Sequence, residues 1–199
     1  MQLAGARFML SAAAPRDMPA DVGFEVAFAG RSNAGKSSAL NRLAGQRKLA
    51  RASATPGRTR LVNFFALDAA SDRRLVDLPG YGYAHAPRHE RARWAELLER
   101  YLAERRSLTG LVLLADSRHA LKPEDETLIA WTRASALPLL LLLTKADKLG
   151  RGAQAQALAR IRPGLASSET SLVFSALSGL GVETARDWIT ARLENSETP

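Results

Sequence analysis

The 199-residue chain has no cysteine and no long hydrophobic run. Without cysteine there are no disulfides, thiolate metal ligands or cysteine nucleophiles; this favours a reducing compartment, and we expect a cytoplasmic protein. The longest apolar stretches, Leu137–Thr144 and Gly110–Ala115, are far shorter than the roughly 18 residues of a membrane-spanning helix. We therefore expect no membrane partner.

Aromatic residues are scarce, at 6%, but 46% of the residues are hydrophobic and 24% are charged. This composition is typical of a globular chain with one sizeable core. We predict an N-terminal extension over residues 1–22, a single domain over residues 23–195 and a frayed polar tail over residues 196–199. We expect a monomer.

Acidic residues are missing from one stretch of the chain. The sequence carries 28 basic and 20 acidic residues, a formal net charge of +8, yet six basic and no acidic residues lie between Arg42 and Arg60. We call these six residues the basic stripe: Arg42, Arg47, Lys48, Arg51, Arg58 and Arg60. The stripe favours a phosphate-rich partner, and a merely solvated basic face is the alternative.

Short strand patterns alternate with helical periodicity. Strands are predicted at Phe24–Ala29, Leu61–Leu67, Arg74–Asp77, Leu111–Asp116, Leu139–Thr144 and Ser171–Phe174. Helices are predicted at Lys36–Leu43, His89–Arg105, Glu124–Ala134, Ala153–Ile161 and Val182–Leu193. The alternation predicts a three-layer α/β fold, with a mostly parallel six-stranded sheet and helices on both faces. Only a short turn around Ala70–Asp72 follows Leu61–Leu67, which is therefore predicted to be the one antiparallel strand.

A P-loop pattern joins the first predicted strand to the first predicted helix. Its residues are Gly30, Arg31, Ser32, Asn33, Ala34, Gly35, Lys36 and Ser37. The glycines let backbone N–H groups turn toward a phosphate, and the helix N-terminus adds partial positive charge. The pattern assigns Lys36 to the outer phosphates and Ser37 to a magnesium ion.

Three later motifs, each after a strand, resemble those of the GTPase superfamily. Asp77-Leu78-Pro79-Gly80 puts a carboxylate beside the metal and a glycine beside the γ-phosphate. Thr144-Lys145-Ala146-Asp147 resembles the guanine-recognition motif, in which the aspartate accepts hydrogen bonds from guanine. Phe174-Ser175-Ala176, followed by Leu177, resembles the last motif, whose backbone N–H groups meet guanine O6.

One residue departs from the usual guanine motif, because Thr144 stands where asparagine is common. A threonine hydroxyl can make one hydrogen bond to the P-loop backbone but cannot offer an amide pair. We expect an intact guanine preference with modest affinity.

The segment before the antiparallel strand resembles a first switch. Its predicted nucleotide contacts are Gly57, Arg58, Thr59, Arg60 and Leu61. Thr55 and Thr59 compete for the magnesium ion, and Thr59 is favoured because it lies just before the strand. The resemblance thus implies Ser37 and Thr59 as direct Mg²⁺ ligands and Asp77 as a ligand through water.

Together these motifs resemble the EngB family, also called YihA or YsxC, in the TrmE-Era-like branch of the P-loop GTPases. The resemblance rests on the P-loop, Thr55–Thr59, Asn63–Phe65, Asp77–Ala84 and Thr144–Asp147. It implies a GTPase that acts as a molecular switch, assists assembly of the large ribosomal subunit and its rRNA, and is needed for normal cell division and septation.

The predicted catalytic residues are Lys36, Thr59, Gly80 and Asn33. Tyr81 stands where Ras-like enzymes have a water-orienting glutamine, so we expect slow hydrolysis. Asn33 resembles the asparagine that helps hold K⁺ in potassium-activated relatives, and a solvated loop asparagine is the alternative.

Other interpretations remain open at this point. Tyr81 and Tyr83 fit either stacking on unpaired RNA bases or packing against the helix after them. The alternative functions are a P-loop nucleotide kinase and an RNA-binding module with a vestigial nucleotide site.

Overall fold

The structure, a computed structural model, describes residues 3–50, 61–70, 72–82 and 88–194. These residues form a seven-stranded sheet in the order β1-β3-β4-β2-β5-β6-β7. The strands are β1 Arg7–Ala12, β2 Phe24–Gly30, β3 Val62–Ala66, β4 Arg73–Asp77, β5 Leu108–Asp116, β6 Leu139–Thr144 and β7 Thr170–Val173. β3 runs antiparallel to both of its neighbours, β1 and β4, and the remaining pairs are parallel.

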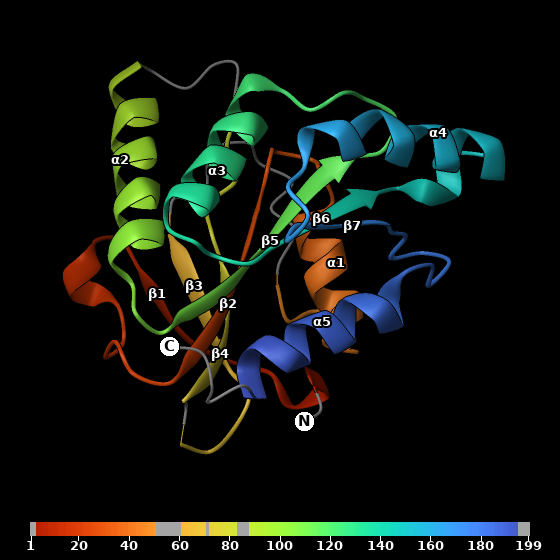
Figure 1. Cartoon of the computed structure of the whole chain (residues 1–199). Coiled ribbons are helices and arrows are strands. Elements are labelled where there is room, and N and C mark those ends of the chain that lie inside the picture. Colours follow the sequence, from red (N-terminus) through yellow and green to blue (C-terminus); the bar gives the residue numbers. More distant parts are fainter. Residues whose placement is uncertain (1–2, 51–60, 71, 83–87, 195–199) are drawn as a thin grey trace.

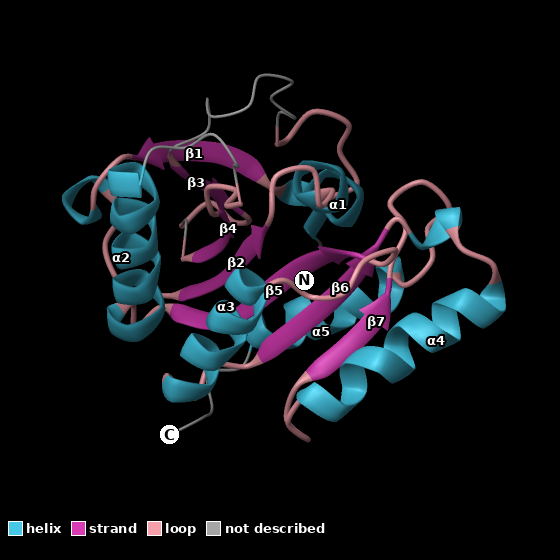
Figure 2. Ribbon diagram, turned by 90° about the horizontal axis from the view of Figure 1, so that it is seen from above, coloured by secondary structure: helices cyan, strands magenta, loops and turns pink. Residues whose placement is uncertain are grey.

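Five α-helices are described: α1 Lys36–Leu43, α2 Arg88–Glu104, α3 Pro123–Ala134, α4 Arg151–Ile161 and α5 Val182–Glu194. Short 3₁₀ turns lie at Leu3–Gly5, Pro15–Asp17, Ala146–Lys148 and Arg162–Gly164. Helices α2, α3 and α4 cover one face of the sheet, and α1 and α5 cover the other (Figures 1 and 2). The predicted three-layer α/β fold and its single antiparallel strand are confirmed.

The strand count differs from the prediction by one. We expected six strands and an extension over residues 1–22, but Arg7–Ala12 forms β1 at the edge of the sheet. Four of its six residues are exposed, so the segment lacks the buried apolar run that marks central strands such as β5 and β6. Its place is set instead by main-chain pairing with β3, a relationship that local sequence does not carry.

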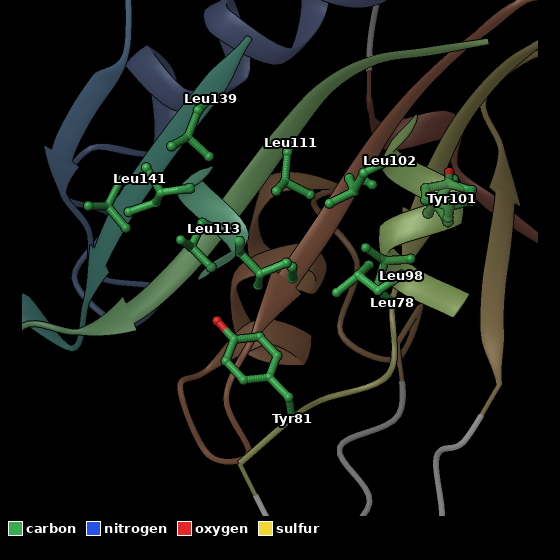
Figure 3. Packing of buried hydrophobic residues seen from close by; sticks show 14 of the residues in the cluster. Leu78, Tyr81, Leu98, Tyr101, Leu102, Leu111, Leu113, Leu139 and Leu141 are labelled. Atoms are coloured by element: carbon green, nitrogen blue, oxygen red, sulfur yellow. The ribbon is translucent and has the colours of Figure 1, made fainter. Parts of the chain in front are cut away.

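Alternation along the central strands builds the two halves of the core. In β5, Leu111 and Leu113 face α2–α4, whereas Val112 and Leu114 face α1 and α5. Figure 3 shows Leu111 and Leu113 beside Leu139, Leu141 and residues of α2. Every residue of β6 is buried, as expected for a central parallel strand covered on both faces.

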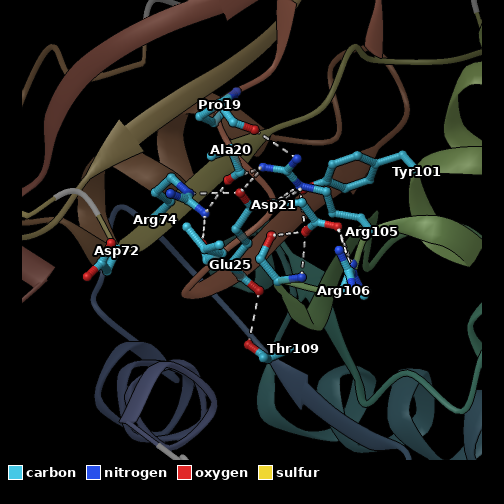
Figure 4. A network of polar contacts seen from close by, with 12 residues as sticks. Pro19, Ala20, Asp21, Glu25, Asp72, Arg74, Tyr101, Arg105, Arg106 and Thr109 are labelled. Carbon is cyan, nitrogen blue, oxygen red and sulfur yellow. Dashed lines mark hydrogen bonds and ion pairs between the residues drawn. The ribbon is translucent and has the colours of Figure 1, made fainter. Parts of the chain in front are cut away.

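A buried ionic network fixes β2 to its surroundings (Figure 4). Glu25, which has no exposed surface, accepts hydrogen bonds from Arg74 at 2.8 Å, Tyr101 at 2.8 Å and Arg105 at 2.7 Å. Burying one carboxylate is costly unless it is paired, and these three donors supply the pairing. The sequence patterns did not indicate this network, because its members come from β2, from β4 and from the C-terminal end of α2 with the residue that follows it.

No helix in the described part of the chain combines the length and apolar character needed to cross a membrane.

Candidate nucleotide-binding site

The P-loop connects β2 to α1 through two left-handed residues. Asn33 has φ of 65° and Gly35, which caps α1, has φ of 91°. Gly30 is needed for a different reason, since a Cβ there would lie 2.8 Å from the carbonyl oxygen of Leu114. The loop thus leaves β2 against β5 and turns sharply into the helix, which leaves the N-terminus of α1 as an anion-binding end.

Lys36 and Asp77 meet at the start of α1. The Lys36 ammonium forms an ion pair with the Asp77 carboxylate, and these side chains are only 11% and 6% exposed. Asp77 ends β4, the strand next to β2, and also accepts a hydrogen bond from Asn63 of β3 at 3.4 Å. Two residues 41 positions apart therefore form one charged centre beside Ser37.

The segment after Asp77 is held against the P-loop by its backbone. Leu78 is buried and donates to Phe28 O at 3.0 Å, and Tyr81 donates to Gly30 O at 3.4 Å. The carbonyl of Tyr81 accepts from Ser32 N–H at 2.9 Å. Pro79 and Gly80 lie between these anchors, next to the phosphate end of the site.

Tyr81 packs in the core, where Figure 3 shows it, with 4% of its surface exposed. Its hydroxyl donates to Asp125 of α3 at 2.5 Å. Burial and the neighbouring Asp125 carboxylate raise the pKa of Tyr81. The packing alternative is correct for Tyr81, but its partner is α3; base stacking by this side chain is excluded in this conformation. Tyr83 lies outside the described residues.

Thr144 makes the predicted hydrogen bond to the P-loop. Its Oγ1 lies 2.6 Å from Ala34 O and 3.1 Å from Ala115 O, and the single hydroxyl hydrogen can be donated to one of them at a time. Thr144 thereby ties the end of β6 to the P-loop without an asparagine.

Asp147 is oriented by the loop after β7. The Ser175 hydroxyl donates to Asp147 Oδ1 at 2.6 Å, and Ser178 N–H donates to Ser175 Oγ at 3.1 Å. Ala146 N–H donates to Phe174 O at 3.1 Å. Ser175 is fully buried, so its side chain positions Asp147, a role that the motif alone did not indicate.

An open cavity of about 660 Å³ lies beside these loops, within the size range of small-molecule sites. Six predicted residues line it: Gly35, Thr144, Lys145, Asp147, Phe174 and Ala176. Leu177, which belongs to the last motif, lines it too. Seven further lining residues were not predicted from motifs: Ser38, Asn41, Arg42, Gly45, Gln46, Arg47 and Arg186. Helical spacing from Lys36 could have placed Ser38, Asn41 and Arg42 near the site, but Arg186 of α5 is far away in sequence.

Some predicted residues do not line this cavity. Arg31, Lys36, Ser37 and Asp77 lie at the phosphate end, and Leu61 lies just before β3 with 37% exposure. The switch residues Gly57, Arg58, Thr59 and Arg60 are outside the described residues.

Asp116 and Arg118 form a charged cluster that sequence reasoning missed. Asp116 ends β5 opposite Thr144, and its carboxylate accepts from Arg118 at 2.7 Å and lies 3.0 Å from Lys145 Nζ. The hydrogen bonds from Arg118 and Lys145 hold the pKa of Asp116 far below its usual range, although burial opposes them.

The donor set at the phosphate end suits a magnesium ion. Ser37 and Asp77 offer a hydroxyl and a carboxylate, the hard oxygen ligands that Mg²⁺ prefers. Within the described ranges, no three histidine or acidic side chains gather as a metal-binding group. Ser37 and Asp77 would leave the other coordination positions of Mg²⁺ to phosphate and water.

Comparison with known proteins agrees with a nucleotide-binding site of the GTPase type. Residues 25–145 match the MMR_HSR1 family, described as "50S ribosome-binding GTPase". A "Probable GTP-binding protein EngB" of Pseudoalteromonas atlantica is 55% identical over 181 residues, 89% of this chain and 87% of that protein. The protein of the same name in Enterobacter sp. strain 638 is 50% identical over 182 residues, 90% of this chain and 86% of that one.

Solved structures share the fold. A crystal structure of "a probable GTP-binding protein engB" superposes with a TM-score of 0.67 at 24% identity, covering 85% of this chain and 98% of that one. Era, solved with MgGDPNP and a 16S rRNA fragment, also gives a TM-score of 0.67, at 21% identity and with 89% and 59% coverage.

The fold, the paired Lys36 and Asp77, and these relatives define a P-loop GTPase. The chain belongs to the EngB family of GTP-binding proteins. GTP binding and GTPase activity are therefore confirmed at the level of the family, and this assignment displaces the nucleotide-kinase alternative.

Proposed function

We propose that this GTPase is a slow molecular switch that docks on rRNA of the large ribosomal subunit when GTP is bound and thereby assists subunit assembly. Normal cell division and septation depend on the same switch. The protein acts as a cytoplasmic monomer without a membrane partner, and its single domain includes β1 together with residues 23–195. The partner is suggested by the family description, a ribosome-binding GTPase, and by the basic stripe at the nucleotide cavity.

The placement of the stripe is the observation that carries this proposal. Arg42 and Arg47 are exposed and line the cavity, and Lys48 beside them is exposed too. No carboxylate among the described residues pairs with any of the three. Unneutralised cations next to a nucleotide site favour a polyanionic partner whose binding responds to the nucleotide.

Asn41 links the stripe to the nucleotide site. Its amide donates to Ala50 O at 2.9 Å, and its carbonyl oxygen accepts from Ala50 N–H at 2.7 Å. These bonds pin the loop that carries Arg47 and Lys48 to α1, the helix that the P-loop opens. Arg51, Arg58 and Arg60 continue the stripe outside the described residues.

In the proposed binding mode, the phosphates lie on the backbone N–H groups of the P-loop and Lys36 turns from Asp77 to the outer phosphates. Ser37 and Thr59 would hold Mg²⁺ directly, and Asp77 would hold it through water. When bound, the ion neutralises charge on the β- and γ-phosphates. The backbone N–H of Gly80 meets the γ-phosphate, and contacts from Gly57 to Leu61 complete the phosphate end.

The guanine base lies in the cavity, where Asp147 accepts hydrogen bonds from its N1–H and amine. Thr144, Lys145 and Ala146 form one wall, and Phe174, Ser175 and Ala176 form another. The N–H groups of Phe174 and Ser175 donate to Leu143 O and Leu180 O, so the N–H of Ala176 is the one of these three that meets O6. The Ser175 hydroxyl occupies one lone pair of Asp147 Oδ1, which leaves Oδ2 and the other lone pair of Oδ1 to accept the two guanine hydrogens.

The position of Tyr81 supports slow hydrolysis. The side chain after Gly80 is committed to Asp125 in the core, so it offers nothing to orient an attacking water. Asn33, exposed on the P-loop, is the side chain available to help hold a K⁺ ion, which would stabilise negative charge developing between the phosphates.

Charge neutralisation tests the docking surface. The double variant Arg47→Gln/Lys48→Gln should bind large-subunit particles about tenfold or more weakly in co-sedimentation. It should also flatten the salt dependence by about one unit for each rRNA phosphate that is no longer neutralised. Arg151→Gln/Arg162→Gln removes the same charge from exposed residues near α4 and should bind like wild type. Equal binding by both double variants would refute the docking surface.

A further inference from the structure

Lys145 carries an unusual combination of backbone and side-chain constraints. Its φ is 57°, in the left-handed region that non-glycine residues rarely adopt. Its Nζ lies 3.0 Å from Asp116 Oδ2, and the residue lines the cavity two positions before Asp147. The backbone and the ammonium group of Lys145 are therefore both fixed beside the place proposed for the base.

Asp116 is itself held rigidly. Arg118 donates from Nε to Oδ1 at 2.9 Å, from Nη2 to Oδ2 at 2.7 Å and from its backbone N–H to Oδ1 at 3.1 Å. Asp116 is paired in register with Thr144, and Ser117 N–H donates to Thr144 O at 2.9 Å. Its side chain is 14% exposed, so solvent competes little for these bonds.

We propose that Asp116 is a positioning residue for purine binding, which tethers Lys145 so that the methylene stem of Lys145 forms a preformed wall against the face of the base. The inference deepens the proposed function, because it rests on the base lying beside Lys145 and Asp147.

The physical advantage is preorganisation. A free lysine side chain loses rotamer freedom when a ligand orders it, and a tethered one has already lost that freedom before binding. The tether also pairs the lysine charge away from the base, which leaves the apolar stem to face the ring. Arg118 supports the arrangement by fixing the orientation of the Asp116 carboxylate.

The test compares nucleotide affinities of four variants by calorimetry. Asp116→Asn removes the charge and keeps the shape, and should weaken GDP binding about five- to tenfold. The affinity for inosine diphosphate should fall by the same factor, because the Lys145 stem touches the face of the ring and not its amino edge. The kcat for GTP at saturation should stay within twofold of wild type, since Asp116 contacts no phosphate.

A double-mutant cycle separates positioning from general damage. Lys145→Met keeps an apolar stem without the amine, so adding Asp116→Asn to it should cost no further affinity. Glu169→Gln breaks a similar bidentate pair with Arg133, at 2.7 and 2.8 Å, away from the cavity, and should leave the GDP Kd unchanged.

Equal losses from Asp116→Asn in the wild-type and Lys145→Met backgrounds would overturn the proposal. If Asp116→Asn lowers Tm more than Glu169→Gln does, the test depends on the Lys145→Met single variant. An unchanged GDP Kd for Lys145→Met would then overturn the proposal. Wild-type protein that binds GDP and ADP equally would instead refute the placement of the base.

Discussion

Tyr81 donates its phenolic hydrogen to Asp125 Oδ1 across 2.5 Å, which joins the residue after Gly80 to the first turn of α3. Asp125 Oδ2 also accepts from Lys122 N–H at 2.9 Å and so caps the same helix. Both Tyr81 and Asp125 are buried. The Tyr81–Asp125 hydrogen bond therefore links the phosphate end of the site to α3.

Tyr81→Phe should destabilise the fold by about 1–2 kcal/mol, because a buried carboxylate loses one of its hydrogen-bond donors. Urea unfolding at pH 7 measures the loss. In an Asp125→Ala background the same change should cost almost nothing. A full loss in that background would show that the Tyr81 hydroxyl stabilises the fold through a partner other than Asp125.

Asp147→Asn should shift base preference from guanine toward xanthine, since an amide can donate to the xanthine C2 oxygen but opposes the guanine amine. Competition between GDP and XDP measures it. Ser175→Ala is the matched comparison: it frees Asp147 Oδ1, so GDP affinity should fall about tenfold with no change in base preference. If Asp147→Asn kept the wild-type preference, base recognition would belong to another residue.

Potassium should accelerate hydrolysis relative to sodium, and removing the Asn33 side chain should abolish the difference. Asn33→Gly is the suitable variant, because φ of 65° strains alanine but not glycine. Multiple-turnover phosphate release in the two salts tests this prediction. Equal wild-type rates in both salts would refute the cation role and leave nucleotide binding untouched.

Asp21 predicts an acid-sensitive contribution to stability. Burial raises the pKa of Asp21, but hydrogen bonds from Ser107 and Arg106 and the Arg105 charge outweigh it and lower the pKa to about 2. The stabilisation is therefore complete above the ordinary pKa of 3.8 and is lost as pH falls toward 2. Asp21→Asn should lower the free energy of unfolding by about 1 kcal/mol at pH 7. In urea unfolding, the stability of this variant should also fall less than that of the wild type as the pH drops from 3.8 toward 2. An unaltered pH profile would contradict the assignment.

Sequence patterns predicted the elements that carry strong local signals. The predicted and observed bounds of α1 and of β6 coincide, because a P-loop opens one and a continuous apolar run marks the other. Thr144 was correctly paired with the P-loop, since the order of the motifs fixes which strand ends meet. The mostly exposed β1 lacked such a signal, and its position depends on pairing with β3.

The parts of the site that were missed depend on contacts between distant elements. Asp116 contacts Lys145 only because β5 and β6 are paired side by side, and Arg186 lines the cavity from α5. Ser175 was predicted only as part of the last nucleotide motif, and the hydrogen bond from its buried hydroxyl to Asp147 was missed. Tyr81 offered two interpretations that only the three-dimensional packing against Asp125 could separate.

The central claim is that the bound nucleotide controls docking on the large subunit. The most direct measurement is the Kd of the wild-type protein for purified large-subunit particles, with GDP and with a nonhydrolysable GTP analogue, over a series of salt concentrations. The account predicts binding at least tenfold tighter with the GTP analogue, weakening steadily as salt rises. Equal affinity with both nucleotides at every salt concentration would contradict it.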